Sequence, residues 1–223
     1  MCGRFTLHQQ TSEVAKSIGA IDLSEVTPFS PSYNIAPSQK APVILKQGLD
    51  FRNQEQLHMR LMNWGLRPAW SSGGNQKPIN ARCETLSEKP MFSGAYEKRR
   101  CIIPANGWFE WSIDRAQKTP WYHKRIDDET IYFAGIWESW ANNDGERGET
   151  FAIITKKSQQ NVSQIHDRMP VILECDSIDD WLNGKIIDFN THYNNLELFP
   201  VSKEVNSVNS TGSQLIKKIP TLF

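Results

Sequence analysis

The sequence has no net charge that would favour one class of partner. Lysine plus arginine and aspartate plus glutamate both number 25 in 223 residues, so the formal net charge at pH 7 is zero. Proteins that hold nucleic acids by a general electrostatic field carry a basic excess, which this chain lacks. Any nucleic-acid site must therefore be a local basic patch.

Long apolar runs and cysteine pairs are also missing. No stretch approaches the ~20 apolar residues of a membrane span, and no charged and then apolar signal peptide precedes the first strand. The four cysteines, at positions 2, 83, 101 and 175, form no CxxC pair. We therefore expect a cytosolic monomer, associated with the nucleoid in a bacterium, with free thiols, no membrane contact, no metal and no cofactor.

The chain does contain many strand-like segments and few helical ones. Hydrophobic residues make up 39% of it, and no internal repeat or low-complexity linker divides it. We expect one domain over 1–223, without Met1 in the mature protein. The expected class is α+β, with a β-barrel-like core of mixed or antiparallel strands and a few short flanking helices, because βαβ alternation is absent.

Local patterns predict the individual elements. A helix is predicted over 11–19, with Gly19 as its stop, and another over 177–184, with Ser177 as its N-cap. The segment 158–166 is also helical in pattern. Strands are predicted over 41–46, 57–66, 121–126, 130–140, 150–157 and 212–219, a strand–turn–strand over 101–111, and loops over 28–39 and 67–78, the second of them mobile at 71–75.

The first five residues, MCGRF, place a cysteine directly behind the initiator methionine. If Met1 is removed, Cys2 carries an α-amine and a thiol two carbons apart, a 1,2-aminothiol that no internal cysteine offers. The ordinary alternative is a cysteine that packs in a first strand. The pentapeptide alone does not choose between the two.

Two further segments combine polar and aromatic residues. INARCET, residues 79–85, has Asn80, Arg82 and Glu84 at alternating positions, which share one face if the segment is extended. A solvated strand face would show the same pattern. ANGWFEW sets Glu110 among aromatic residues; if its carboxyl points inward, burial raises the pKa and makes it an acid near neutral pH, whereas a nearby amine would lower the pKa.

Two loops offer the remaining candidates. IHDRMP, residues 165–170, places His166 and Arg168 before a strand, although a single histidine is more often a surface residue than a catalyst. YNIAP, residues 33–37, offers an asparagine and a proline of fixed geometry on a loop.

Together these segments resemble one family, the SOS response-associated peptidases (SRAP). The resemblance runs over nearly the whole chain. It comprises MCGRF, YNIAP, WGLRPAW at 64–70, INARCET, RRCIIPANGWFEW at 99–111, FAGIWE at 133–138, IHDRMPVIL at 165–173 and the closing VNSVNSTGSQLI.

The resemblance implies an enzyme-like capture of abasic sites in single-stranded DNA. The mature N-terminal Cys2 would trap the ring-opened sugar aldehyde, first as a Schiff base and then as a thiazolidine closed by the thiol, so that the DNA–protein crosslink shields the site. An α-amine titrates near ~8 and is partly neutral at cellular pH, whereas a lysine near ~10.4 is not.

The resemblance also implies roles for individual residues. Asn80 would hold the N-terminal group and the sugar oxygen, Glu110 would act as general acid and base, and His166 would assist ring opening. Pro37 with Trp70 would splay the strand and stack on bases, although Ser71 follows where relatives can have a second aromatic residue. The implied DNA-binding set is Arg4, Asn34, Pro37, Trp70, Arg82 and Arg168, with the three arginines on phosphates.

Two other functions stay open from the sequence. MCG also begins the N-terminal-nucleophile glutamine amidotransferases, in which the cysteine attacks an amide and the α-amine is the base. A hydrolase of that kind, including one that removes its own Met1, is one alternative. A non-covalent reader of single-stranded or modified DNA is the other.

Overall fold

The structure is a computed structural model. It describes residues 2–22, 29–49, 55–70, 77–112, 118–141 and 145–220. The loop segment predicted to be mobile, 71–75, and the initiator Met1 lie outside the described residues.

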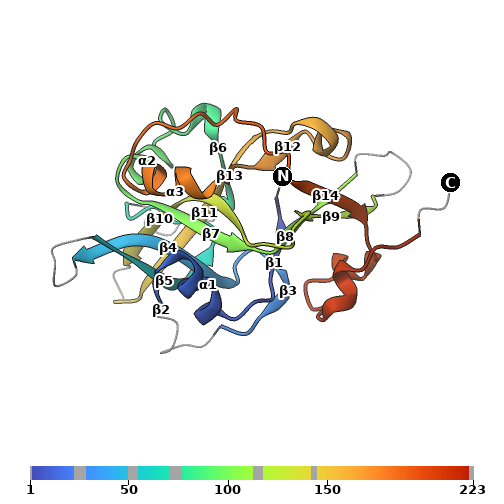
Figure 1. The fold of residues 1–223 in the computed structure, drawn as a ribbon. Coiled ribbons are helices and arrows are strands. Elements are labelled where there is room, and N and C mark those ends of the chain that lie inside the picture. The colour runs from blue at the N-terminus through green and yellow to red at the C-terminus, as the bar shows by residue number, and fades with distance from the viewer. Residues whose placement is uncertain are drawn as a thin grey trace.

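Five long strands close into a barrel at the centre of the fold (Figure 1). Antiparallel pairs join β11 to β10, β10 to β7, β7 to β4 and β4 to β5, and a parallel pair, Thr150↔Asn63 and Phe151↔Trp64, joins β5 back to β11. The barrel strands are β4 (Lys40–Leu49), β5 (Glu55–Trp64), β7 (Arg100–Ala105), β10 (Ile131–Ala141) and β11 (Arg147–Lys157).

Short strands extend the barrel sheet at its edges. β6 runs parallel to the second half of β11, and β12 pairs antiparallel on the opposite edge, so that Thr155 of β11 lies between Arg82 and Pro170. The short strands are β2 (Ile21–Asp22), β6 (Asn80–Arg82), β12 (Arg168–Pro170) and β13 (Ile172–Leu173).

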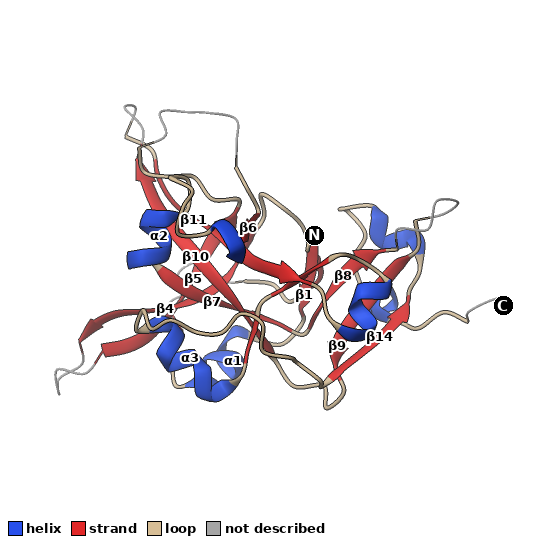
Figure 2. Ribbon diagram, turned by 90° about the horizontal axis from the view of Figure 1, so that it is seen from above, coloured by secondary structure: helices blue, strands red, loops and turns tan. Residues whose placement is uncertain are grey.

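A second sheet of five strands lies beside the barrel, in the order β14-β9-β8-β1-β3. The chain passes from β7 in the barrel to β8 in this sheet through Asn106. Its strands are β1 (Arg4–Leu7), β3 (Ser32–Ile35), β8 (Gly107–Trp111), β9 (Pro120–Arg125) and β14 (Leu196–Pro200). In both ribbon views the N-terminus lies between the barrel and this second sheet (Figures 1 and 2).

Helices are few and short, as the α+β prediction requires. α1 ends at Gly19, which adopts the left-handed conformation (φ 68°) as its predicted stop. The helices are α1 (Thr11–Ile18), α2 (Ser93–Lys98) and α3 (Cys175–Leu182), and the 3-10 turns are η2 (Cys83–Thr85), η3 (Gln160–Gln164), η4 (Lys203–Asn206) and η5 (Ser213–Ile216). No helix in the described part of the chain has the length and apolar character needed to cross a bilayer.

Two apolar cores hold the sheets together. The larger fills the barrel and extends to Phe5 and Trp108 of the second sheet. The smaller lies on the other face of that sheet, where η4 and η5 contribute Val205 and Leu215. Because successive strand residues face opposite sides, β8 contributes Trp108 to one core and Phe109 to the other.

Four element predictions were wrong in detail. The predicted loop 28–39 contains β3, which pairs with β1. The predicted strand 212–219 is the 3-10 turn η5, because Leu215 packs into the smaller core and pairing is limited to one bridge, Val201↔Lys218. Helix α3 begins at Cys175, with Glu174 rather than Ser177 as its N-cap residue. Over 158–166 the helical segment is the 3-10 turn η3, which ends at Gln164.

Candidate functional site

Cys2 lies two residues before β1, next to the strand that carries Glu110. β1 pairs with β8 through Arg4↔Phe109, so the residues before Arg4 run beside those after Phe109. The Cys2 side chain is fully buried. Burial raises the pKa of the thiol well above its ordinary value, and the Glu110 carboxylate adds to the rise. The thiol and this carboxyl are therefore close neighbours.

Asn80 holds the backbone of Cys2 from the other side. Its Nδ2 donates to the Cys2 carbonyl oxygen at 2.8 Å. Its Oδ1 is buried and has no hydrogen-bond partner among the described residues. A buried amide oxygen without a partner is costly, so this atom is well placed to accept from a group that arrives in the site.

Glu110 points inward from β8. Its side chain is 1% exposed, and burial raises its pKa to about 7. The Asp167 carboxylate also raises this pKa, which places the loop of His166 near Glu110. From the sequence alone, opposing influences on this pKa are expected without a net direction; in the structure burial outweighs the others. At pH 7 the carboxyl exists in both protonation states, as a proton-transfer group requires.

His166 completes the group from the loop before β12. Its Nδ1 accepts from the backbone N–H of Arg168 at 3.0 Å, and the Asp167 Oδ1 lies 2.9 Å from the same nitrogen. Burial lowers the pKa of the ring, so the neutral form prevails at neutral pH. Asp167 would serve as counter-ion when the ring takes a second proton. The structure thus joins Asn80 to Cys2 by a hydrogen bond and places Glu110 and the loop of His166 beside them.

Arg4 and Asn34 form an internal network on the opposite face of the second sheet. The Arg4 Nη1 donates to Asn34 Oδ1 at 2.7 Å and to the Val205 carbonyl at 2.8 Å, and Nη2 donates to the Asn206 carbonyl at 3.3 Å. The Asn34 Nδ2 donates to two further carbonyls, those of Ser207 and Ser210. These two side chains tie β1 and β3 to the C-terminal turns.

Arg168 is also occupied by protein groups. Its guanidinium donates to both carboxylate oxygens of Glu84, at 2.6 and 3.0 Å, and to the Thr155 carbonyl at 2.7 Å. The paired arginine lowers the pKa of Glu84 to about 2. Arg82, in contrast, is exposed at the edge of the sheet. Phosphate contacts by all three arginines stay predictions, and Arg82 has the most accessible side chain of the set.

The face expected of INARCET is formed only in part. Asn80 to Arg82 is extended as β6, but Glu84 lies in the turn η2 and reaches Arg168. Pro37 is exposed, and Trp70 is 66% exposed, so both rings are open to a ligand. Sequence reasoning missed Glu84 and Asp167 as partners of Arg168 and His166; the acidic residue beside each basic one was the available signal.

Comparison with known proteins agrees with these motifs. The chain matches the family described as SOS response associated peptidase (SRAP) over residues 1–208. It is 36% identical over 228 residues to the abasic site processing protein YoqW of Bacillus subtilis, covering 97% of this chain and 99% of that one. It is 31% identical to the abasic site processing protein YedK of Escherichia coli, covering 98% and 100%.

A solved structure supports the fold. A crystal structure of a protein from Bacteroides thetaiotaomicron superimposes with a TM-score of 0.86, at 24% identity, over 98% of this chain and 100% of that chain. At this identity the match establishes the architecture. With the family match over residues 1–208 and the relatives above 30% identity, the chain belongs to the SRAP family.

Proposed function

We propose that the mature chain, a single domain beginning at Cys2, processes abasic sites in single-stranded DNA by capturing them covalently. The observation that carries the proposal is the grouping of Asn80, Glu110 and His166 around the one residue that can present a 1,2-aminothiol. Relatives that align over nearly their full length are named abasic site processing proteins. A crosslink would shield the damaged strand.

The amine of Cys2 begins the reaction. It adds to the aldehyde of the ring-opened sugar, and loss of water leaves an imine. The thiol then adds across the C=N bond, its sulfur to carbon and its proton to nitrogen, and closes the thiazolidine. Because burial and Glu110 keep the thiol protonated, the amine is the better first nucleophile.

Three side chains assist these steps. The Asn80 Oδ1 is free to accept from the new amine, while its Nδ2 fixes the Cys2 backbone. Glu110, with a pKa of about 7, takes the proton from the amine and returns one to the departing water. His166 assists opening of the sugar ring, with Asp167 as counter-ion.

The DNA contacts are proposed in two groups. Arg82, Pro37 and Trp70 are exposed and would meet phosphates and bases directly. Arg4, Asn34 and Arg168 would act mainly by holding the segments that line the site, since protein groups already occupy their side chains.

The test starts with the intact mass of the purified protein, which must correspond to a chain beginning at Cys2. That protein and Cys2→Ala are then incubated with abasic single strands, intact single strands, glutamine and peptides. We expect a crosslink that survives denaturing electrophoresis only when the parent protein is incubated with the abasic strand. A borohydride-trappable imine from Cys2→Ala is compatible, because its α-amine remains.

Other outcomes favour the alternatives. Hydrolysis of glutamine or peptides without a crosslink would assign the chain to the N-terminal-nucleophile hydrolases. Salt-sensitive binding without any adduct would make it a non-covalent reader. A denaturation-resistant, thiazolidine-type adduct formed by Cys2→Ala would contradict the proposed role of the thiol.

A further inference from the structure

A groove outside the site of Cys2 runs over one end of the barrel. It consists of an open hollow of about 860 Å³ and a smaller one of about 170 Å³, and Asn63 and Trp140 line both. The hollows lie over the ends of β4, β5, β10 and β11. Its basic side chains and the tryptophan beside them are Lys40, Arg67, Lys77, Trp140 and Arg147.

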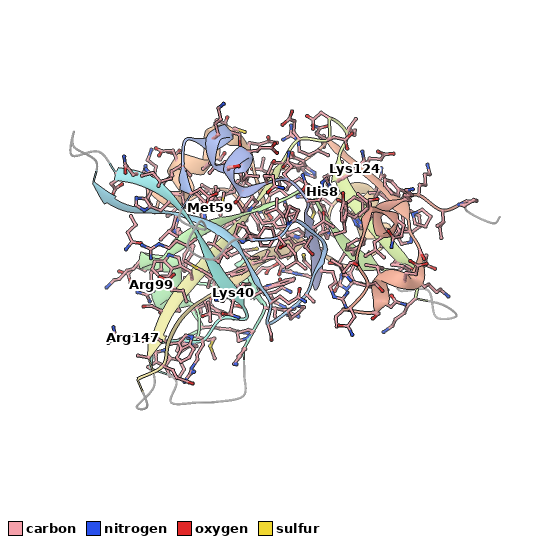
Figure 3. All side chains as sticks on the ribbon, turned by 90° about the horizontal axis from the view of Figure 1, so that it is seen from below. His8, Lys40, Met59, Arg99, Lys124 and Arg147 are labelled. Carbon is pink, nitrogen blue, oxygen red and sulfur yellow. The ribbon has the colours of Figure 1, made fainter. Side chains whose placement is uncertain are left out.

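The groove is basic although the whole chain is neutral. Among the residues that the structure describes, two lysines and two arginines line it, against one carboxylate, Glu149. That carboxylate binds Arg60 at 3.0 Å, so its charge is balanced. Figure 3 shows Lys40 and Arg147 in the same part of the view, away from Lys124. A cluster of this sign suits an anionic ligand.

A cation and an aromatic ring stack inside the groove. The guanidinium carbon of Arg67 lies 3.9 Å from the centroid of the Trp140 ring. Gly148 pairs with Trp140 across the β10–β11 ladder, and a Cβ on that glycine would stand 2.9 Å from the ring. Glycine thus makes room for the indole on the strand surface. Planar guanidinium and indole groups are the side chains on which bases stack.

The groove and the site lie on the same two chain segments. Lys77 precedes Asn80 by three residues, and Thr150 in the smaller hollow precedes Ile153, the partner of Asn80 on β11, by the same number. Three residues of extended chain span about 10 Å. Along these segments the groove therefore begins about 10 Å from Asn80.

We propose that this groove binds the single-stranded DNA that flanks the captured nucleotide, with phosphates on its lysines and arginines and a base stacked against the Arg67–Trp140 pair. The proposal rests on the proposed function for its ligand. It adds a length requirement, since a strand must continue past the damaged nucleotide to use the groove.

The first measurement is equilibrium affinity for an intact single strand, which does not depend on the crosslink. Trp140→Ala and Arg147→Ala should each weaken binding, the first by about tenfold through lost stacking and the second with a salt slope flattened by about 0.7. Trp140→Phe keeps a ring and should retain most of the affinity. Lys16→Ala, an exposed lysine of α1, is the control for charge alone.

The second measurement compares abasic strands that end beside the lesion with strands extended on the 5′ or the 3′ side. In the parent protein, extension on one side should accelerate capture at low DNA concentration, and Trp140→Ala and Arg147→Ala should lose that advantage. If the parent forms no adduct with any abasic strand, the proposed function fails while the affinity data still test the groove.

Several results would overturn the groove proposal. One is a pair of folded variants that bind intact strands as tightly as the Lys16→Ala control. Another is that Trp140→Ala and Arg147→Ala keep the parent's preference for extended strands. A third is competition by a poly-glutamate peptide that equals the DNA strand at matched charge, which would assign the groove to acidic polypeptides.

Discussion

At the scale of single residues, Glu110 affects the ionisation of its neighbour Cys2. Both are buried, and each would carry a negative charge if it ionised. Burial raises both pKa values, and the carboxylate raises that of the thiol further. The pair therefore favours a protonated thiol and leaves a single group, the carboxyl, that exchanges its proton near pH 7.

Replacing Glu110 with glutamine keeps the shape of the side chain and removes the exchangeable proton. Adduct formation should slow by ~10²–10⁴-fold, while affinity for DNA changes little. The rate of the parent should vary through pH 7, where its carboxyl titrates, and the variant should lack that inflection. Single-turnover crosslinking from pH 5 to 9 measures both, after the mass of the variant shows that it begins at Cys2. A parental rate at every pH would make Glu110 structural.

Arg82 is exposed and is the last residue of β6, two positions after Asn80. If it contacts one phosphate, Arg82→Ala should flatten the slope of log affinity against log salt by about 0.7, because one fewer counterion is released from a single strand. Titrations at several salt concentrations, with Lys16→Ala as the matched control, measure this. An unaltered slope would place Arg82 outside the DNA interface.

Arg4 links separate elements. Its guanidinium joins β1 to Asn34 on β3 and to the last carbonyls of η4, a span of about 200 residues in sequence. Burial lowers the pKa of Arg4, which reflects how far the group is withdrawn from water. Loss of this side chain should therefore first disorder the elements that it joins.

Arg4→Ala should loosen η4 and η5, because three carbonyl or amide oxygens lose a charged donor. Each such hydrogen bond is worth about 1.5–3 kcal/mol. Hydrogen exchange should accelerate over 203–216 and remain slow in the barrel strands. Arg4→Lys keeps the charge but lacks the two planar Nη donors of the guanidinium, so it should restore only part of the protection. Unchanged exchange together with a flatter salt slope would instead support the phosphate contact that the family resemblance implies.

At the scale of the whole molecule, a buried histidine of the second sheet makes stability depend on pH. His123 of β9 stacks on Trp108 with ring centroids 4.6 Å apart, and it is fully buried. Burial lowers its pKa to about 4, against an ordinary value of 6.5. Between those two values the unfolded chain takes up a proton that the folded chain excludes. His123 therefore leaves the free energy of unfolding unchanged above about pH 6.5 and lowers it as the pH drops towards 4.

His123→Leu should remove this acid sensitivity. The difference in pKa corresponds to about 3 kcal/mol at pH 4, lost by the parent and kept by the variant. Urea unfolding at pH 7.5, 5.5 and 4.5 should show that the free energy of unfolding of the variant rises relative to that of the parent as the pH falls. If both proteins lose stability in parallel, other groups dominate acid unfolding.

Local sequence patterns determined the barrel strands, α1 and the candidate catalytic residues. The strands at 41–46, 57–66 and 150–157 are continuous or alternating apolar runs whose burial is decided within the segment. MCGRF, INARCET and ANGWFEW likewise name Cys2, Asn80 and Glu110 without any coordinates. Their grouping followed from the family resemblance, since local patterns do not specify which segments meet.

Long-range pairing decided the rest. The strand pattern over 212–219 became η5 because Leu215 packs into the smaller core, and pairing there is limited to the bridge Val201↔Lys218. Arg168 binds Glu84, and Arg4 binds Asn34, across 84 and 30 residues of chain. Charge and residue type were visible in the sequence, but solvent exposure and the identity of each partner depend on which strands pair, and that is a property of the whole fold.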